Sequence, residues 1–355
     1  MSTQLADYVT LGRSGLRVSP LCLGTGAFGV DWGTDETVSL ELLNRYIEAG
    51  GNFFDTADNY AEGRSERLLG RFVRERRLRD RAVIATKFSG YTDLGNPNGG
   101  GNGRKNIYRA LEQSLDRLET DYIDLYWLHC WDAVTPVEEV VSTCNDLVRE
   151  GKIRHYGFSN IPAWYVTRAQ TIAEREGKER LVAIEMEYSL IERNIEREHV
   201  PAARELGIAI CPWSPLGGGF LSGKYQRNED SWSGQGRLEM WRRSGNVFLR
   251  TFTNEDWATL HTLREVAKEI NKSTAQVALN WVVNRPVITS TIIAATSLSQ
   301  LNGNLASLEV DLPASLRARL DETSNPQSGY PYYLFAPEFR SILAGQTSIR
   351  PWRSE

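Results

Sequence analysis

Short apolar runs alternate with longer segments of helical periodicity along most of the chain, and this alternation restricts the possible folds more than any other feature. Eight such runs occur, and most contain consecutive apolar residues, which is typical of parallel strands covered by helices. They occupy residues 21–24, 52–55, 82–86, 123–127, 155–158, 182–187, 208–212 and 291–295. Because a strand followed by a helix, repeated eight times, closes into a barrel, the sequence predicts an α/β protein with the (β/α)8 TIM-barrel fold.

The segments between the runs have the spacing of amphipathic helices. Leu111, Leu115 and Leu118, for example, share one helix face. We expect Thr34 to cap the first helix and Gly50 to end it. The predicted helices occupy residues 34–50, 64–73, 105–118, 137–149, 164–176, 195–206, 257–270 and 274–283.

Three segments lie outside the repeating pattern. Residues 8–18 contain a turn between short apolar pieces, which predicts an N-terminal β-hairpin. Residues 219–256 form a long polar loop after the seventh strand, and residues 324–355 form a tail rich in proline and aromatic residues. No linker divides the sequence, so we expect one domain over residues 1–355, with the hairpin in residues 1–20 and the tail at its end.

Composition excludes several classes of protein. With 41 Lys and Arg against 45 Asp and Glu, the net charge of −4 lacks the basic surplus of a nucleic-acid-binding protein. The four cysteines and four histidines lack the spacing of a disulfide framework or a zinc site, so no metal is expected. No apolar run reaches the ~20 residues of a membrane span. The N-terminus has no signal-peptide pattern, so we expect a cytoplasmic protein without a membrane partner.

A glycine motif after the first strand imitates a dinucleotide-binding fingerprint. Residues 24–29 match G-x-G-x-x-G, and Asp55 closes the next apolar run 31 residues after Gly24. In a Rossmann unit the helix begins within the glycines, whereas here Trp32 and its neighbours separate them from the expected cap. A βα loop at the barrel mouth is therefore favoured, and a Rossmann dehydrogenase is the alternative, which a single eight-stranded barrel would exclude.

Four residues with complementary chemistry lie at the predicted carboxyl ends of the strands, where barrel enzymes carry their active sites. Asp55, Lys87 and His129 end consecutive strands, and Tyr60 follows in the loop after the second strand. A carbonyl that accepts a hydride needs a proton, and a phenol of lowered pKa supplies one. We expect the Lys87 ammonium to lower that pKa, with Asp55 orienting the lysine and His129 binding the substrate oxygen.

These residues and their surroundings resemble the aldo-keto reductase superfamily, in the branch of aryl-alcohol dehydrogenases and potassium-channel β-subunits. The likeness covers roughly residues 11–323. Its motifs are FFDTADNYAEGRSERLLG, IATK, SLDRLETDYIDLYWLH, GKIRHYGFSN, EMEYSLIER, WSPLGGGFLSGKY, TAQVALNW and ATSLSQLNGN. The resemblance implies a barrel with an N-terminal hairpin and hydride transfer from NADPH to an aldehyde or ketone. It also implies that Tyr60 is the general acid of a tetrad with Asp55, Lys87 and His129.

The resemblance also implies a set of cofactor-binding positions. They are Gly24, Thr25, Ser159, Asn160, Glu185, Trp213, Ser214, Leu216, Lys224, Thr296, Ser297, Gln300 and Asn304. Glu185 replaces the usual Gln, and a carboxylate cannot donate to a carboxamide oxygen unless it is protonated. The loop after the last strand lacks the usual cation for a 2′-phosphate, so we expect NADP but leave NAD open. The cations available in the long loop are Arg237, Arg242, Arg243 and Arg250.

Aromatic residues after the strand ends predict an apolar pocket for a bulky aryl or alicyclic carbonyl. The candidate substrate contacts are Phe28, Trp32, Phe88 and Trp131, with Tyr330, Tyr332, Tyr333 and Phe335 in the tail. In relatives the tail folds over the barrel mouth. A non-catalytic nicotinamide-binding subunit like the potassium-channel β-subunits is the alternative, although those carry Asn at the position of His129. The sequence leaves the physiological substrate and the oligomeric state open.

Overall fold

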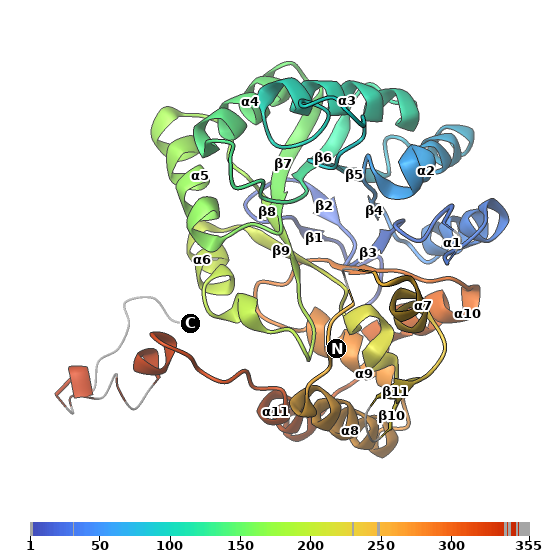
Figure 1. The fold of residues 1–355 in the computed structure, drawn as a ribbon, viewed down its shortest axis with the longest axis vertical. Helices are drawn as coiled ribbons and strands as arrows, with labels where there is room; N and C mark the ends of the chain where they lie inside the picture. The colour runs from blue at the N-terminus through green and yellow to red at the C-terminus, as the bar shows by residue number, and fades with distance from the viewer. Residues whose placement is uncertain are drawn as a thin grey trace. The chain divides into compact units, whose positions relative to one another are not determined.

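Eight parallel strands form one sheet, in the order β12-β3-β4-β5-β6-β7-β8-β9 (Figure 1). They are β3 Leu21–Gly24, β4 Phe53–Asp55, β5 Val83–Phe88, β6 Ile123–Leu128, β7 Ile153–Ser159, β8 Ala183–Glu187, β9 Ala209–Trp213 and β12 Thr291–Ile293. The segment before β12 joins the two edges, since the Ile210 N–H donates to the Val287 carbonyl at 3.2 Å and the Thr289 N–H donates to the Ile210 carbonyl at 3.0 Å. The predicted TIM barrel is confirmed, and the Rossmann alternative is excluded.

This computed structural model describes residues 3–30, 32–228, 231–246 and 249–336, together with 339, 342–345 and 347. Residues 1–324 form one unit and residues 325–355 a second. The placement of the tail over the barrel mouth stays a prediction. No helix in the described part of the chain is long and apolar enough to cross a membrane.

Helices surround the strands on the outside (Figure 1). They are α1 Glu36–Glu48, α2 Arg64–Glu75, α3 Arg104–Leu118, α4 Val137–Arg149, α5 Ala163–Glu176, α6 His199–Leu206, α8 Asn254–Glu269, α9 Thr274–Val283, α10 Leu298–Leu305 and α11 Ala314–Thr323. Most follow the predicted segments, because the apolar periodicity that defines them is also what packs them on the barrel. The bounds of α4 and α9 agree with the prediction to the residue.

Three predictions at helix ends are wrong in detail. Asp35, not Thr34, caps α1, since its carboxylate accepts from the Val38 N–H at 2.9 Å, while the buried Thr34 hydroxyl contacts the Ala27 carbonyl instead. The helix predicted over 195–206 is divided into the short turn η2 Asn194–Glu196 and α6. Pro201 lies in the first turn of α6, the position in a helix that tolerates proline. Thr253 forms a capping box with Asp256, so α8 begins before residue 257.

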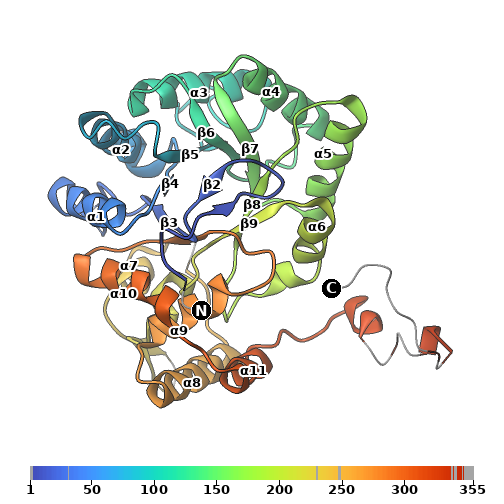
Figure 2. The same ribbon diagram turned by 180° about the vertical axis from the view of Figure 1, so that it is seen from behind.

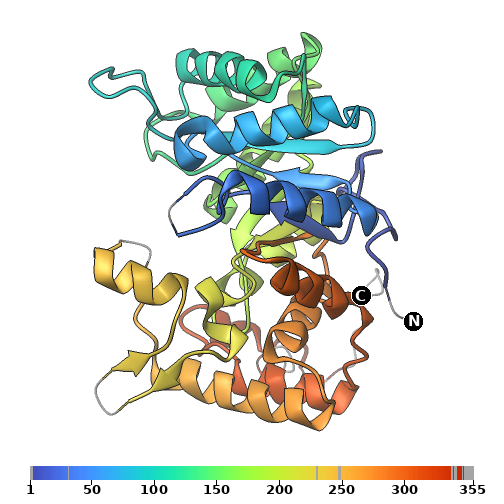
Figure 3. The ribbon, with the colours of Figure 1, turned by 90° about the vertical axis from the view of Figure 1, so that its right-hand side faces the viewer.

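The long segment after β9 carries structure of its own. It contains the turn η3 Gly217–Ser222, the strand pair β10 Gln226–Arg227 and β11 Trp232–Ser233, and the helix α7 Arg237–Ser244. In Figure 3 this yellow segment lies on the left of the barrel and the blue N-terminal strand pair on the right. The segment expected to be a polar loop is therefore a small subdomain at one end of the barrel.

The hydrophobic core has two layers. The outer layer packs strands against helices, and the inner one fills the barrel with residues such as Cys22, Phe53 and Trp127. The Trp127 ring needs the space above Gly157 on the next strand, because a Cβ there would stand 2.3 Å from the ring. The predicted hairpin, β1 Val9–Thr10 with β2 Arg17–Val18, adds two residues to the inner layer, Leu11 and Val18. Figure 2 shows it across the end of the barrel.

Candidate active site

The four residues predicted to work together are brought together by the strand register. Asp55 ends β4, Lys87 is the next-to-last residue of β5, and His129 follows β6. Parallel pairing keeps all three at the carboxyl end of the barrel, where successive strands stop at similar heights. Tyr60 follows β4 and begins the short turn η1 Tyr60–Gly63.

Lys87 is the centre of the polar contacts. Its ammonium group donates to the Asp55 carboxylate, to the Thr56 carbonyl at 3.0 Å and to the Tyr60 hydroxyl at 3.4 Å. The Tyr60 ring meets the His129 ring edge-on, with 5.9 Å between their centroids. A phenol, an ammonium, a carboxylate and an imidazole therefore share one site, the arrangement that proton transfer to a carbonyl oxygen requires.

The backbone that presents Tyr60 is held in an unusual conformation. Ala61 and Glu62 have φ values of 49° and 58°, both left-handed, and Gly63 follows at 83°. Glycine adopts this conformation freely, but two consecutive left-handed L-residues are costly unless the surroundings enforce them. This turn directly precedes α2 in the chain and places the Tyr60 phenol in the site.

Burial controls the protonation states of these groups. It raises the pKa of Tyr60 to about 12, and the lowering effect of Lys87 is smaller than the effect of burial. Lys87 lowers the pKa of the phenol as expected, but burial outweighs it, so the net shift is upward. Burial and the charge of Lys87 lower the pKa of His129 to about 3, so the imidazole is neutral at physiological pH. Burial opposes the charge of Lys87, but Asp55 and Glu185 outweigh it and raise the pKa of this lysine.

Glu185 on β8 is a fifth member of this site. Its side chain is buried, and Oε2 lies 3.6 Å from the Lys87 ammonium nitrogen. Burial, and next the negative charge of Asp55, raise the pKa of Glu185 to about 8. A carboxyl group that keeps its proton can donate a hydrogen bond as an amide would.

Asn160 connects four of the strand ends. Its backbone N–H donates to the Glu185 carbonyl at 3.1 Å, and its side-chain amide donates to the His129 carbonyl at 3.0 Å. Its amide oxygen accepts from the Trp213 indole at 3.0 Å. The left-handed backbone of Asn160, at φ 49°, permits this reach. The amide also donates to the Ser159 hydroxyl. Ser159, Asn160 and Trp213, all predicted from the sequence as cofactor positions, therefore form one hydrogen-bonded group beside the site.

Apart from Lys224, the remaining sequence-predicted cofactor positions lie in three places. Gly24 pairs with Asp55, and the Thr25 N–H and hydroxyl both donate to the Asp55 carbonyl, at 2.8 and 3.0 Å, so Thr25 helps to fix that strand end. Ser214 and Leu216 belong to the turns after β9, where the Ser214 hydroxyl accepts from a backbone N–H. The loop before α10 holds Thr296 and Ser297, and α10 itself holds Gln300 near its start and Asn304 near its end.

Two neighbouring cations in the segment after β9 have no carboxylate partner in the described part of the chain, and a third, Arg227, donates to the Asn254 amide oxygen instead of a carboxylate. The two neighbours are Lys224, which is exposed, and Arg237, the first residue of α7. Burial lowers the pKa of Arg237, and partial burial and the charge of Arg237 lower the pKa of Lys224. The Arg237 guanidinium stacks on the Trp32 ring at 4.5 Å. Two neighbouring cations without counter-charges are suited to bind an anion.

The four candidate substrate contacts divide into two pairs. Phe28 and Phe88 are buried in the outer core layer, and Phe88 packs on Tyr126 with 4.8 Å between the rings, which is a packing position. Trp32 and Trp131 are partly exposed. Trp131 contacts the rings of Trp164 and Tyr165. The tail aromatics Tyr330, Tyr332, Tyr333 and Phe335 belong to the second unit.

Sequence reasoning missed three residues near the site. The Trp127 indole lies beside the Asp55 carboxylate, and the available signal was its place two residues before His129, because alternate residues of an extended chain share a face. Trp164 belongs to the aromatic group at Trp131. Asp58 is buried with neither carboxylate oxygen in a hydrogen bond within the described chain, and no sequence pattern points to it.

Comparison with known proteins extends these observations. The model of the Aldo/keto reductase family matches residues 20–325. An uncharacterized oxidoreductase of Bacillus subtilis, YrpG, is 36% identical over 331 residues, which cover 89% of this chain and 95% of that protein. An NADP(+) aryl-alcohol dehydrogenase of Phanerodontia chrysosporium is 32% identical over 336 residues, covering 90% and 86%. A probable voltage-gated potassium channel subunit beta of rice is 34% identical over 306 residues, covering 86% and 92%.

Proposed function

The chain belongs to the aldo/keto reductase family, and from that premise we propose that it is an enzyme that reduces an aldehyde or ketone to the alcohol, with Tyr60 supplying the proton. The observation that carries the proposal is the contact of Lys87 with both the Asp55 carboxylate and the Tyr60 hydroxyl. Family membership supports an oxidoreductase that uses a nicotinamide cofactor. The proton donor, the substrate class and the choice of NADP are our proposals.

The chain's own residues supply everything that the proton transfer needs. Tyr60 holds a proton at physiological pH because its pKa is about 12, so it is ready to act as an acid. The neutral imidazole of His129 can donate a hydrogen bond to a carbonyl oxygen without adding charge to the site. When the Tyr60 hydroxyl gives up its proton, the adjacent Lys87 ammonium stabilises the phenolate that remains. Asp55 holds Lys87 charged and in place for that moment.

A reduced nicotinamide, when bound, supplies a hydride to the carbonyl carbon. The polar group formed by Ser159, Asn160 and Trp213 lies beside the site and suits the nicotinamide end. Lys224 and Arg237 suit the phosphate groups, because both are cations without carboxylate partners in the described residues. Two cations favour the more highly charged NADPH over NADH, and the name of the fungal dehydrogenase, which includes NADP(+), supports that choice.

For the substrate we propose a bulky aryl or alicyclic carbonyl. The partly exposed Trp131 is two residues from His129 and is part of an aromatic group with Trp164 and Tyr165. Flat aromatic faces near a reacting carbonyl favour substrates that can stack on them. The similarity to an aryl-alcohol dehydrogenase supports the same substrate class.

The test is the loss of NADPH absorbance with a panel of aryl aldehydes and bulky ketones. We expect wild type to turn over and Tyr60→Phe to lose about a hundredfold to ten-thousandfold in kcat, the range typical of a missing general acid. Tyr108→Phe is the matched control, since Tyr108 lies on α3 and contacts Glu150 instead of the site. Full activity in Tyr60→Phe contradicts the assignment of the proton donor.

The similarity to the potassium-channel subunit supports a second candidate, a regulatory subunit that binds a nicotinamide cofactor without turnover. The same assay separates the two. Cofactor binding with no reduction of any carbonyl in the panel favours the regulatory candidate, whereas turnover that depends on Tyr60 favours the enzyme.

A further inference from the structure

Glu185 brings a second carboxyl group to an ammonium group that already has one. Lys87 contacts the Asp55 carboxylate directly, and Glu185 Oε2 lies 3.6 Å from the same nitrogen. The side chains of all three residues are at most 4% exposed. Glu185 Oε2 has no hydrogen-bond partner among the residues that the structure describes. One positive charge therefore faces two buried carboxyl groups.

Ionising both carboxyl groups at this place costs more free energy than ionising one. Burial penalises each negative charge, and the two acids repel each other when both are charged. The single ammonium stabilises one carboxylate, so the pair retains a proton that is released only at higher pH. Each acid has one oxygen without a hydrogen-bond partner in the described residues, but Asp55 Oδ2 accepts a hydrogen bond from Lys87, whereas the Glu185 oxygen nearest to that ammonium stands 3.6 Å away. The geometry therefore places the retained proton on Glu185.

We propose that Glu185 is a positioning residue that holds this proton at neutral pH, and that its ionisation at alkaline pH weakens Tyr60 as an acid and slows carbonyl reduction. The proposal rests on the proposed function of Tyr60. A second negative charge beside Lys87 reduces the stabilisation that the ammonium offers to a phenolate. Tyr60 then holds its proton more tightly, and the rate falls as the acid becomes weaker.

The other titratable groups around Glu185 cannot account for a change between pH 7 and 9. The pKa of His129 is about 3 and that of Tyr60 about 12. The pKa of Lys87 is raised above its ordinary value. Burial raises the pKa values of the thiols on the neighbouring strands, Cys22 on β3 and Cys211 on β9. Burial raises the pKa of Asp55, and the charge of Lys87 opposes this shift. Asp55 shares its proton with Glu185, so it belongs to the proposal and is not a competing group.

Outside this site, Asp58 also has a pKa near neutral, about 7, raised first by burial and then by the charge of Glu66. It is therefore the group most easily mistaken for Glu185 in a pH profile. Asp58→Asn removes its titration and leaves the carboxyl pair at Lys87 unchanged.

The experiment is the pH profile of kcat for carbonyl reduction from pH 6 to 10, for wild type, Glu185→Gln and Asp58→Asn. Gln has nearly the shape of Glu but cannot ionise. We expect kcat of wild type to fall roughly three- to tenfold through an inflection near pH 8, as expected for a modest weakening of the acid. The inflection should persist in Asp58→Asn and be absent from Glu185→Gln, which retains its rate at pH 9.

A second readout does not depend on turnover. Infrared spectra of the protein without cofactor, recorded from pH 6 to 10, should contain a protonated-carboxyl band that disappears near pH 8 in both wild type and Asp58→Asn. If Glu185→Gln does not fold, the band in Asp58→Asn still decides the question. An inflection that remains in Glu185→Gln, or a band already lost below pH 6, overturns the proposal. If no carbonyl is reduced at all, the proposed function fails, and the infrared band alone decides the state of Glu185.

Discussion

Asp58 shows how far burial alone can move the charge of a single residue. Its side chain is 3% exposed, and neither carboxylate oxygen has a hydrogen-bond partner in the described chain. Burial, and next the negative charge of Glu66, raise its pKa to about 7, although Arg117 opposes the shift. Asp58 is two residues before Tyr60, and its backbone N–H donates to the Lys87 carbonyl at 3.2 Å.

This residue makes stability depend on pH. An ordinary Asp in the unfolded chain titrates at ~3.9, so the folded protein binds the Asp58 proton more tightly than the unfolded chain does. The contribution of this proton to stability is fully present below about pH 4 and is lost as the pH rises to about 7. Asp58→Asn removes the dependence. We expect the free energy of unfolding of the variant, relative to wild type, to rise by about 1–3 kcal/mol between pH 4.5 and pH 8.

Urea unfolding at the two pH values measures this change. The same substitution at the exposed Asp311 is the control and should leave the difference near zero. A constant difference between Asp58→Asn and wild type at both pH values would mean that Asp58 ionises normally in the folded protein.

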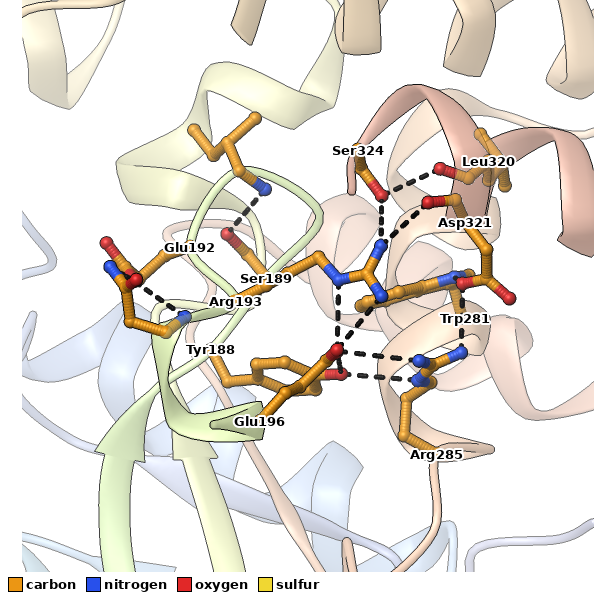
Figure 4. A network of polar contacts seen from close by, with 12 residues as sticks. Tyr188, Ser189, Glu192, Arg193, Glu196, Trp281, Arg285, Leu320, Asp321 and Ser324 are labelled. Carbon is orange, nitrogen blue, oxygen red and sulfur yellow. Dashed lines mark hydrogen bonds and ion pairs between the residues drawn. The ribbon is translucent and has the colours of Figure 1, made fainter. Parts of the chain in front are cut away.

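At the scale of elements, a network of charged groups ties the loop after β8 to α9 and α11 (Figure 4). Arg193 donates to both carboxylate oxygens of Glu196 at 3.0 Å and to the Asp321 carbonyl at 2.9 Å. Arg285 donates to the Asp321 carboxylate at 2.9 Å, and the Trp281 indole donates to the same oxygen at 2.9 Å. The contacts of Arg193 with Asp321 and Ser324 join segments more than one hundred residues apart, where no local pattern signals the pairing.

Glu196 lies between the two arginines of this network. Burial alone would raise its pKa, but hydrogen bonds from Arg193 and Tyr188 and the charges of both arginines lower it below its ordinary value. Its contribution to stability is present above the ordinary pKa of Glu and is lost as the pH falls through the lower folded value. We expect Glu196→Gln to reduce the free energy of unfolding at pH 7 by about 1–3 kcal/mol, and by less in acid.

Chemical unfolding at pH 7 and pH 4 tests this, with Glu265→Gln as the matched control. Glu265 also contacts an arginine, Arg319, but its side chain is half exposed, so its loss should cost about 0–1 kcal/mol. Equal losses in the two variants would show that the network adds nothing beyond surface ion pairs.

At the scale of the whole molecule, the site draws on residues from most of the barrel. The tetrad comes from the region of β4 to β6, Glu185 from β8, and Lys224 and Arg237 from the segment after β9. A ligand that contacts all of these binds only the closed barrel and therefore stabilises the folded state. At a ligand concentration one hundred times Kd the stabilisation is ~2.7 kcal/mol.

We therefore expect NADPH to raise Tm of wild type by several degrees. The rise should shrink in Arg237→Met, because one of the two cations proposed to bind the phosphate groups is lost, and NADPH should lose more of its effect than NADH. Arg243→Met is the matched control, since Arg243 lies on the same helix but is exposed and paired with Glu239. Differential scanning fluorimetry with each cofactor measures the shifts, and equal shifts in Arg237→Met and wild type contradict the role of Arg237.

Much of this architecture is encoded locally. All eight barrel strands and the bounds of α4 and α9 follow from runs and periodicities in the sequence, because short-range hydrophobic pattern and helix propensity act within each segment. The strand ends also place Asp55, Lys87 and His129 on one side of the barrel, since parallel strands share a direction. The motifs that carry the resemblance and the match to the family model cover nearly the same part of the chain.

Tertiary structure alone decided the protonation states of the groups in the candidate site and the residues that these groups contact. The sequence predicts correctly that Lys87 lowers the pKa of Tyr60, but it does not reveal the larger opposing effect of burial, because desolvation depends on how completely neighbouring strands exclude water. Phe88 is a pocket candidate in sequence and a packed core residue in the fold, because alternate strand residues face opposite sides. Glu185 gains its importance only from its distance to Lys87, which closure of the barrel sets across residues nearly one hundred positions apart.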